Sequence, residues 1–258
     1  MHNTRFEKYY KEQHIIAENE WDLFMEALRR PLPSTFRVAG HRETKHAINK
    51  AIKETYIPSL EKATFNDEPL PVPSAIPWYP DGLAWKLDVG RKELRKSADY
   101  KRFHQFLVYE TEIGNISRQE AVSMLPPLFL NVRHHHSVID LCASPGSKTS
   151  QILEAMDPPT GIIVANDADQ KRAHLLVHNS SRLSSPALMV TNLDASVFPS
   201  IKYQGKSLRF DRVLADVPCS GDGTLRKNVG IWKTWTPMEG NGLHRLALYA
   251  SDLKWVLI

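Results

Sequence analysis

The sequence has little cysteine and no long apolar run. Only Cys142 and Cys219 occur among 258 residues, which argues against a disulfide-bonded scaffold and fits a reducing compartment. No apolar stretch approaches the ~20 residues that a transmembrane helix needs, and the polar N-terminal residues do not have the pattern of a secretory signal peptide. We therefore expect a globular protein that does not associate with membranes, with a sizeable core in one large domain or two small ones.

The sequence also has no strong excess of one charge: its formal net charge is +4 and its isoelectric point is near 9.0. The basic residues nevertheless gather between Lys86 and Arg102, with aromatic residues close by in the sequence. Such a cluster is compatible with a nucleic-acid-binding surface. A solvated helix face with ion pairs four residues apart is the simpler interpretation when the cluster is taken alone. Its members are Lys86, Arg91, Lys92, Arg95, Lys96, Lys101 and Arg102.

The N-terminal region has the pattern of a small α+β unit over residues 15–57. Apolar residues at helical spacing predict a helix over Glu18–Leu28, then a strand over Thr35–Ala39 and a second amphipathic helix. The inward-facing residues are expected to be Trp21, Phe24, Met25 and Leu28 in the first helix, and Ala47, Ile48, Ala51 and Ile52 in the second. Further on, the hydroxyl of Ser117 and the carboxylate of Glu120 have the spacing of a capping box, which predicts a helix start. Pro126 and Pro127 are expected to interrupt that helix.

From Val138 onward the chain alternates short apolar runs with helical patterns, which predicts a parallel sheet with right-handed crossovers. The predicted strands are Val138–Leu141, Gly161–Ala165, Ala187–Val190 and Phe210–Ala215. The predicted helices run from Lys148 to Met156 and from Gln170 to Leu183. The fold class is therefore α/β in this half of the chain.

A proline–glycine turn and three acidic residues mark the strand ends as the place for a ligand. Pro145 and Gly146 force a tight turn between the first strand and its helix, where backbone N–H groups face a ligand. Asp167, 21 residues after Gly146, lies where a carboxylate accepts the ribose hydroxyls of a nucleoside. Asp194 and Asp216 follow the next two strands. Asp167 could instead serve as a helix cap, although Asp169 suits that role equally well.

Two other motifs suggest chemistry that we discount. The segment from Ala143 to Thr149 ends in Lys-Thr like a phosphate-binding P-loop, but it lacks that motif's glycines. Three consecutive histidines, His134, His135 and His136, cannot present three ligands to one ion, because neighbouring side chains point apart. We expect a polar loop there and no metal site.

Cys219 has a chemical rationale of its own. Carbon 5 of cytosine is a poor nucleophile until a thiolate adds at carbon 6, so a pyrimidine C5 methylase needs a cysteine near its methyl donor. The glycines at 221 and 223 give the following loop the freedom to approach a base. For Cys142 a buried, apolar role is the preferred interpretation.

Together these residues resemble the Sun family of RNA cytosine-5 methyltransferases. The motifs that carry the resemblance are Asp140–Thr149, Ala165–Asp169, Asn192–Ser196 and Asp216–Thr224. Upstream, Glu20–Leu28, Pro33–Arg37, Pro77–Tyr79 and Gly114–Met124 are similar to the eukaryotic tRNA cytosine-5 methyltransferase branch. The resemblance implies a class I S-adenosylmethionine-dependent, Rossmann-like sheet that is incomplete at the C-terminus. It also implies a small α+β N-terminal RNA-binding segment, with a division into residues 1–110 and 111–258.

The resemblance assigns the cofactor, S-adenosyl-L-methionine, to the strand ends. Cys142, Ala143, Ser144, Pro145, Gly146, Ser147 and Lys148 would surround its methionine end and ribose. Asp167 would take the ribose hydroxyls, Asp194 the adenine amino group and Asp216 the region of the methionine amine. The target cytosine would be extruded from the RNA, as base-modifying enzymes require.

One family feature is missing from this sequence. The family uses a Pro-Cys cysteine, here Cys219, to assist product release, and a later Thr-Cys cysteine as the nucleophile; no Thr-Cys occurs here. The sequence after His244 also departs from the family pattern, so we expect a truncated or alternatively spliced product. Its sheet would have four family strands and an improvised fifth strand over Lys254–Ile258. Weakened stability and partial cofactor binding would follow, with the fourth strand at an exposed edge.

The expected function is therefore S-adenosylmethionine-dependent methylation of C5 of cytosine in RNA, with tRNA as the expected substrate. The alternative is a catalytically inactive RNA-binding fragment of the same family. The resemblance further implies a nuclear location, with the nucleolus as one option within the nucleus.

Overall fold

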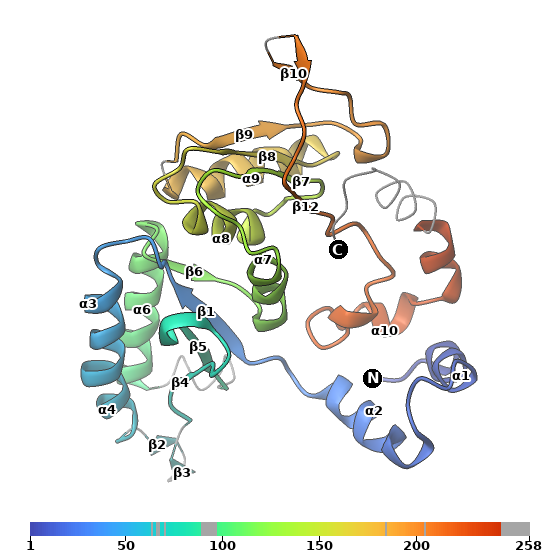
Figure 1. Cartoon of the computed structure of the whole chain (residues 1–258). Coiled ribbons are helices and arrows are strands. Elements are labelled where there is room, and N and C mark those ends of the chain that lie inside the picture. Colours follow the sequence, from blue (N-terminus) through green and yellow to red (C-terminus); the bar gives the residue numbers. More distant parts are fainter. Residues whose placement is uncertain are drawn as a thin grey trace. The chain divides into compact units, whose positions relative to one another are not determined.

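The computed structural model describes residues 1–62, 64–65, 68–69, 71–88, 97–183, 185–203 and 205–243, with the backbone alone for Phe65, Glu68 and Tyr203. These residues form two compact units (Figure 1). One unit comprises Met1–Leu32 and the described residues from Val217 on, and the other comprises Pro33–Asp216. The predicted division at residues 110 and 111 lies inside helix α6, Ala98–Glu112. Four residues of the basic cluster, Arg91, Lys92, Arg95 and Lys96, and the predicted last strand lie outside the described residues.

The larger unit contains the predicted parallel sheet, whose four strands are confirmed to within two residues at each end. Its strands are β7 (Ser137–Asp140), β8 (Ile162–Asn166), β9 (Leu188–Thr191) and β12 (Arg212–Leu214), in the order β12-β7-β8-β9. The register pairs Leu214 with Asp140 and Asp140 with Ala165, all in parallel. The strand ends that carry the predicted ligand residues are therefore aligned at one edge of the sheet.

Two helices connect these strands and cover their apolar side chains. Helix α8 (Ser147–Ala155) follows β7, and α9 (Gln170–Ser180) with a 3₁₀ turn, η5 (Ser181–Leu183), follows β8. Buried Ile152, Leu153 and Met156 pack against Val138 and Ile163 of the sheet. The side chain of Asp169 caps α9 by accepting a hydrogen bond from the Arg172 N–H at 2.9 Å. Asp167 is thus free of the capping role.

The same unit carries a second, antiparallel sheet with the order β4-β5-β1-β6. Its strands are β1 (Ser34–Val38), β4 (Ser74–Ala75), β5 (Ala84–Leu87) and β6 (Ile116–Arg118). Its helical elements are α3 (Lys45–Ala51), a π-helical turn η2 (Ile52–Tyr56), α4 (Ile57–Leu60) and α6. Phe36, Trp85 and Phe103 lie in the core between this sheet and the helices. Ala47 is exposed, against the prediction, whereas Ile48 and Ile52 are buried as predicted.

The predicted capping box is wrong. Ser117 lies in strand β6, which pairs with β1, and the following 3₁₀ turn, η4 (Ala121–Met124), has no side-chain cap. Pro126 and Pro127 do not interrupt a helix but begin one, α7 (Leu125–Phe129), where the missing N–H groups cost nothing. The spacing of Ser117 and Glu120 matches a capping box by coincidence. Strand pairing with β1 determines the conformation of Ser117 instead.

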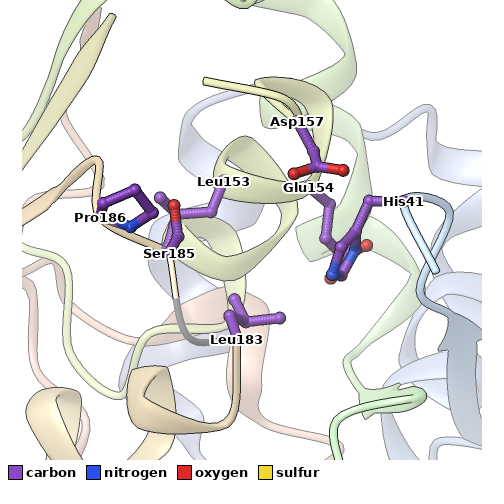
Figure 2. Close-up of a pocket in the computed structure, with 7 residues that line it drawn as sticks. All are labelled: His41, Leu153, Glu154, Asp157, Leu183, Ser185 and Pro186. Atoms are coloured by element: carbon purple, nitrogen blue, oxygen red, sulfur yellow. The ribbon is translucent and has the colours of Figure 1, made fainter. Parts of the chain in front are cut away.

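A buried polar network joins the antiparallel sheet to helix α8. Arg37 of β1 is completely buried and forms an ion pair with Glu154 of α8, while its Nε donates to Gln119 Oε1 at 2.7 Å. Gln119 Nε2 in turn donates to Gln151 Oε1 of α8 at 2.9 Å. A pocket of about 60 Å³ lies beside the ion pair, with the His41 ring directed toward Glu154 (Figure 2). It is too small for a nucleoside.

The smaller unit is built from both ends of the described chain. Helices α1 (Thr4–Glu12) and α2 (Trp21–Arg29), the latter preceded by the 3₁₀ turn η1 (Glu18–Glu20), pack with η7 (Asp222–Thr224) and α10 (Ile231–Thr234). Phe6 and Met25 are buried against Leu225, Trp232 and Trp235. The predicted α+β unit over residues 15–57 is thus divided, since α2 belongs to this unit and β1 to the other.

The remaining short elements are β2 (Thr64–Phe65), β3 (Glu68–Pro69), η3 (Pro80–Gly82), η6 (Ala195–Val197), β10 (Lys202–Tyr203) and β11 (Lys206–Ser207). Within the part of the chain that the structure describes, no helix is both long and apolar enough to cross a bilayer.

Candidate cofactor site

The strand order of the parallel sheet produces a reversal at its carboxyl edge. From β7 the chain moves outward to β8 and β9, then returns to place β12 on the other side of β7. Open α/β sheets bind ligands outside the carboxyl ends of the strands at such a reversal. The predicted residues after β7, β8, β9 and β12 all lie at this edge. The predicted cofactor site therefore has the position that the topology favours.

The loop between β7 and α8 is held to both neighbouring strands. The Leu141 N–H donates to the Leu214 carbonyl at 2.9 Å, and the Ala143 N–H donates to the Asn166 carbonyl at 2.7 Å. Gly146 has a φ of +104°, and a Cβ at this position would lie 3.0 Å from Leu176 Cδ1. Only glycine adopts this turn without strain. The two hydrogen bonds to the neighbouring strands hold the loop in this shape.

Asp140 is a buried carboxyl to which sequence reasoning gave no role. Its Oδ2 accepts a hydrogen bond from Thr149 Oγ1 at 2.7 Å, and its Oδ1 has no hydrogen-bond partner among the described residues. Burial raises the pKa of Asp140 to about 7, although the Thr149 hydrogen bond lowers it. Asp140 therefore exchanges a proton near neutrality at the end of the central strand.

Asp167 is buried and already hydrogen bonded. Its oxygens accept from the Ser144 N–H at 3.2 Å, the Asp169 N–H at 3.1 Å and Arg172 Nε at 3.2 Å. A carboxylate has about four lone-pair sites, so these three donors leave about one for a ligand. Arg172 also donates through Nη2 to the Ser144 carbonyl at 2.7 Å, which makes it a clamp between Asp167 and the loop.

Asp194 and Asp216 are more accessible than Asp167. Asp194 is exposed, and hydrogen bonds from the Ser196 N–H and Oγ lower its pKa, so it stays ionised. The side chain of Asp216 is 56% exposed and forms an ion pair with Lys148 Nζ at 2.6 Å. Lys148 lies in the first turn of α8, so this pair links the end of β12 to the loop after β7.

Cys142 lies among the carboxylates. Its thiol is half-buried, and burial raises the pKa of Cys142 to about 11, with further raising by Asp140, Asp167 and Asp216. The group therefore remains a neutral thiol at physiological pH. The three carboxylates border one region, because Asp140, Asp167 and Asp216 each contact a residue between Ser144 and Thr149.

Cys219 belongs to the smaller unit and is exposed. Its loop is anchored by Asp222, whose two oxygens accept from Tyr10 Oη at 2.7 Å and Trp235 Nε1 at 2.6 Å. Gly221 has a φ of +78°, and a Cβ there would lie 2.9 Å from Ile231 Cδ1. The N-terminal helix α1 therefore helps to hold the Pro-Cys loop, which sequence reasoning did not predict.

The three histidines form a backbone turn. The carbonyl of His134 accepts from the N–H groups of Thr160 and Gly161, and a Cβ on Gly161 would lie 2.1 Å from the His136 carbonyl oxygen. Among the described residues, no three His, Cys, Asp or Glu side chains come together in a way that could hold a metal ion.

Residues missed by the sequence interpretation are those that hold the site together. Asn166, the last residue of β8, donates to the Leu141 carbonyl at 3.0 Å and accepts from the Leu193 N–H at 3.0 Å. The position of Asn166 at a strand end, next to Asp167, could have identified it as a site residue from the sequence. Arg172 lies on the first helical turn after Asp169, and nothing in the sequence pattern distinguished it from a solvated helix residue.

A parallel sheet of this order, with a glycine turn after its central strand and acidic residues after the next strands, is the Rossmann-like arrangement that class I methyltransferases share with other nucleotide-binding proteins. A solved structure agrees: NSun6 of Pyrococcus horikoshii, determined with SFG, is similar with a TM-score of 0.60 and 19% identity, over 96% of this chain and 79% of that one.

The sequence comparisons narrow the class to a family. Residues 127–246 match the family described as 16S rRNA methyltransferase RsmB/F. The chain is 48% identical over 256 residues to the multisite-specific tRNA:(cytosine-C(5))-methyltransferase of Saccharomyces cerevisiae, covering 95% of this chain and 37% of that protein. It is 45% identical to the enzyme trm4b of Schizosaccharomyces pombe, covering 96% of this chain and 41% of that protein. Residues 127–246 thus belong to the Sun, or RsmB/F, methyltransferase family, and over most of its length the chain is similar to the two tRNA methyltransferases. It spans roughly two fifths of these two relatives.

Proposed function

We propose that this chain binds S-adenosyl-L-methionine at the carboxyl edge of the parallel sheet and serves the methylation of C5 of cytosine in RNA, with tRNA as the substrate. The observation that carries the proposal is the reversal at β7, where the loop from Cys142 to Lys148 contacts Asp167 through the Ser144 N–H and Asp216 through Lys148. The tRNA substrate is supported by the names of the relatives from Saccharomyces cerevisiae and Schizosaccharomyces pombe.

The residues at this edge suit the chemistry of the cofactor. The methionine end carries an ammonium group, and the exposed Asp216 carboxylate offers an acceptor for it. The remaining acceptor site of Asp167 is assigned to the ribose hydroxyls, and the exposed Asp194 is assigned to the adenine amino group. The loop from Cys142 to Lys148 is assigned to the methionine end and ribose, where Gly146 lets the backbone approach closely.

The bound cofactor supplies an electrophilic methyl group. The chain's own residues hold the carboxylates in place for the cofactor, since Lys148 fixes Asp216 and Arg172 fixes Asp167. The Cys142 thiol is neutral, so it does not compete with the RNA for the methyl group. Cys219 is assigned to product release, by its place in the Pro-Cys motif. The target cytosine would have to leave its base stack to reach the site.

Calorimetric titration with S-adenosyl-L-methionine tests the cofactor site. We expect saturable 1:1 binding that Asp216→Asn weakens by about 10- to 150-fold, because a lost charge-assisted hydrogen bond is worth ~1.5–3 kcal/mol. Asp211→Asn is the matched control, because Asp211 precedes β12 at the opposite end of the sheet. Absence of binding to the unaltered chain, with its thermal transition intact, would refute the proposal.

Transfer of a labelled methyl group to an unmodified tRNA transcript tests the activity. Because the sequence holds no Thr-Cys cysteine, transfer would require Cys219, besides its assigned release role, to supply the thiolate that adds to carbon 6 of the cytosine. We therefore expect label in 5-methylcytosine with the unaltered chain and none with Cys219→Ala. Cofactor binding without any transfer would restrict the function of this chain to cofactor and RNA binding.

We also propose that residues 1–110 contact the RNA and that the protein is nuclear. Exposed Lys86, Lys101 and Arg102 supply positive charge for the first proposal, and the likeness to the eukaryotic relatives supports the second. Imaging of a fluorescent fusion tests the location, and exclusion from nuclei would contradict it.

A further inference from the structure

A second pocket, of about 340 Å³, lies in the larger unit behind the cofactor loop. Its walls come from the turn between α6 and β6, the start of α8, and the end of α9 with η5. Pro145, Gly146 and Ser147 line it, whereas Cys142, Lys148, Asp167, Asp194 and Asp216 do not. The pocket therefore shares Pro145, Gly146 and Ser147 with the proposed cofactor site but none of that site's carboxylates.

The pocket is positively charged. Arg118 and Arg182 line it, and neither guanidinium has a hydrogen bond or ion pair to another described residue. The carboxylate that lines it, Glu154, is already neutralised by Arg37. The carboxylates on the last turn of α6, Glu110 and Glu112, do not line it. Arg118 is exposed as a residue, and partial desolvation of its guanidinium lowers its pKa.

The rest of the wall consists of hydrogen-bonding groups on a rigid frame. Ser117, Ser147 and Ser150 are among the residues that line the pocket. Arg42 Nη2 donates to the Arg182 carbonyl at 2.9 Å, and a Cβ on Gly114 would lie 2.7 Å from that carbonyl oxygen. The backbone that carries Arg182 is therefore fixed against the α6–β6 turn. Little conformational entropy is lost when a ligand binds to such a frame.

We propose that this pocket, which we name the arginine pocket (Arg118, Arg182, Ser117, Ser150), binds a phosphate of the substrate RNA backbone. Two free guanidiniums and several hydroxyls match a phosphodiester, which accepts bidentate hydrogen bonds from arginine. A contact of this kind fixes the register of the RNA without reading its sequence. The proposal rests on the proposed function, since it assigns to the same substrate a contact beside the cofactor loop.

The test compares RNA binding by Arg118→Gln, Arg182→Gln and the double variant over a range of salt concentrations. The probe is an unmodified tRNA transcript in a fluorescence anisotropy titration. We expect each single variant to weaken binding about three- to tenfold and to lower the slope of log K against log salt by about 0.7 to 0.9 per lost phosphate contact. Ser117→Asp, which keeps both arginines, is expected to weaken binding by repelling the phosphate.

Arg133→Gln is the matched control. Arg133 is an exposed arginine of the same unit that precedes β7, and so lies at the opposite edge of the sheet from the cofactor loop. We expect this variant to bind tRNA with unchanged affinity and salt slope. All variants should keep the thermal transition of the unaltered chain and its affinity for S-adenosyl-L-methionine.

Three results would overturn the proposal. The first is unchanged tRNA affinity and salt slope in the double variant, and the second is an equal loss in Arg133→Gln. The third is competition by a polyglutamate of matched charge as strong as competition by unlabelled tRNA, which would assign the pocket to an acidic protein. If the unaltered chain binds no cofactor but tRNA binding still depends on both arginines, the proposed cofactor function fails while the pocket stands.

Discussion

The buried ion pair between Arg37 and Glu154 yields a sharp prediction about stability. We expect Glu154→Gln to destabilise the larger unit strongly, because it leaves the Arg37 charge buried without a counter-charge. The Arg37 side chain is 0% exposed and that of Glu154 is 7% exposed, so water cannot replace the lost partner. Arg37 Nη2 already has no hydrogen-bond partner among the described residues, so few other contacts would stabilise the buried guanidinium once its counter-charge is lost.

The expected loss is about 3–5 kcal/mol, the usual cost of breaking one side of a buried pair. For a unit of this size each kcal/mol lowers Tm by about 2–4 °C, so the expected shift is roughly 6–20 °C. Replacing both residues by leucine should cost less than Glu154→Gln alone, because no charge then remains buried. Non-additivity between the two positions is thus part of the prediction.

Urea unfolding followed by tryptophan fluorescence measures these differences, with calorimetric melting as the second readout. The matched control is Glu54→Gln, which breaks the exposed pair between Lys50 and Glu54 at 3.7 Å. Pairs of that kind contribute at most about 1 kcal/mol. If Glu154→Gln unfolds at the same urea concentration as Glu54→Gln, Arg37 does not depend on its partner and the reasoning is wrong.

Three other substitutions test features of the site. Gly146→Ala should lower the free energy of unfolding by about 1–3 kcal/mol, because residue 146 has a positive φ and the added Cβ would contact a leucine of α9. Gly223→Ala is the control and should melt almost unchanged, since no atom lies within 4 Å of the added Cβ. Equal melting points for the two variants would contradict this. Burial raises the pKa of Asp140 to about 7, so this group stabilises the fold below its unfolded pKa near 3.8 and loses that contribution as pH rises through 7. Melting at pH 5 to 8 should show this slope in the unaltered chain and a flatter one in Asp140→Asn; parallel slopes would count against it. Asp222→Ala should raise the rate at which Cys219 reacts with a thiol reagent, because the loop loses both anchors; an unchanged rate would show that the loop is held otherwise.

The sequence predicted the parallel sheet well because each of its strands is an apolar run followed at once by a turn or an acidic residue. Val138–Leu141 and its glycine turn left little choice of conformation, and βαβ connections allow one handedness. The strand order could not be derived in the same way, since it depends on how β12 packs beside β7.

The N-terminal half was predicted less well because distant contacts decide its structure. The stripe of α2 was identified correctly, with Met25 buried, but its packing partners lie near Trp232 and not in the neighbouring strand. Ser117 was assigned to a helix start, although strand pairing with β1 places it in β6. Within the site, acidic residues after strands could be listed from the pattern, but the burial of Asp167 and its contact with Arg172 required the structure.

The smaller unit has a consequence for how this protein is made. Asn3 Nδ2 donates to the carbonyl of Trp232, 229 residues further along the chain. At ribosomal speeds of about 5–20 residues per second, roughly 10 to 45 seconds separate the synthesis of those two residues. During that time Phe6 and Met25 have no completed core, so the nascent N-terminus presents a binding surface for chaperones until translation passes Trp235.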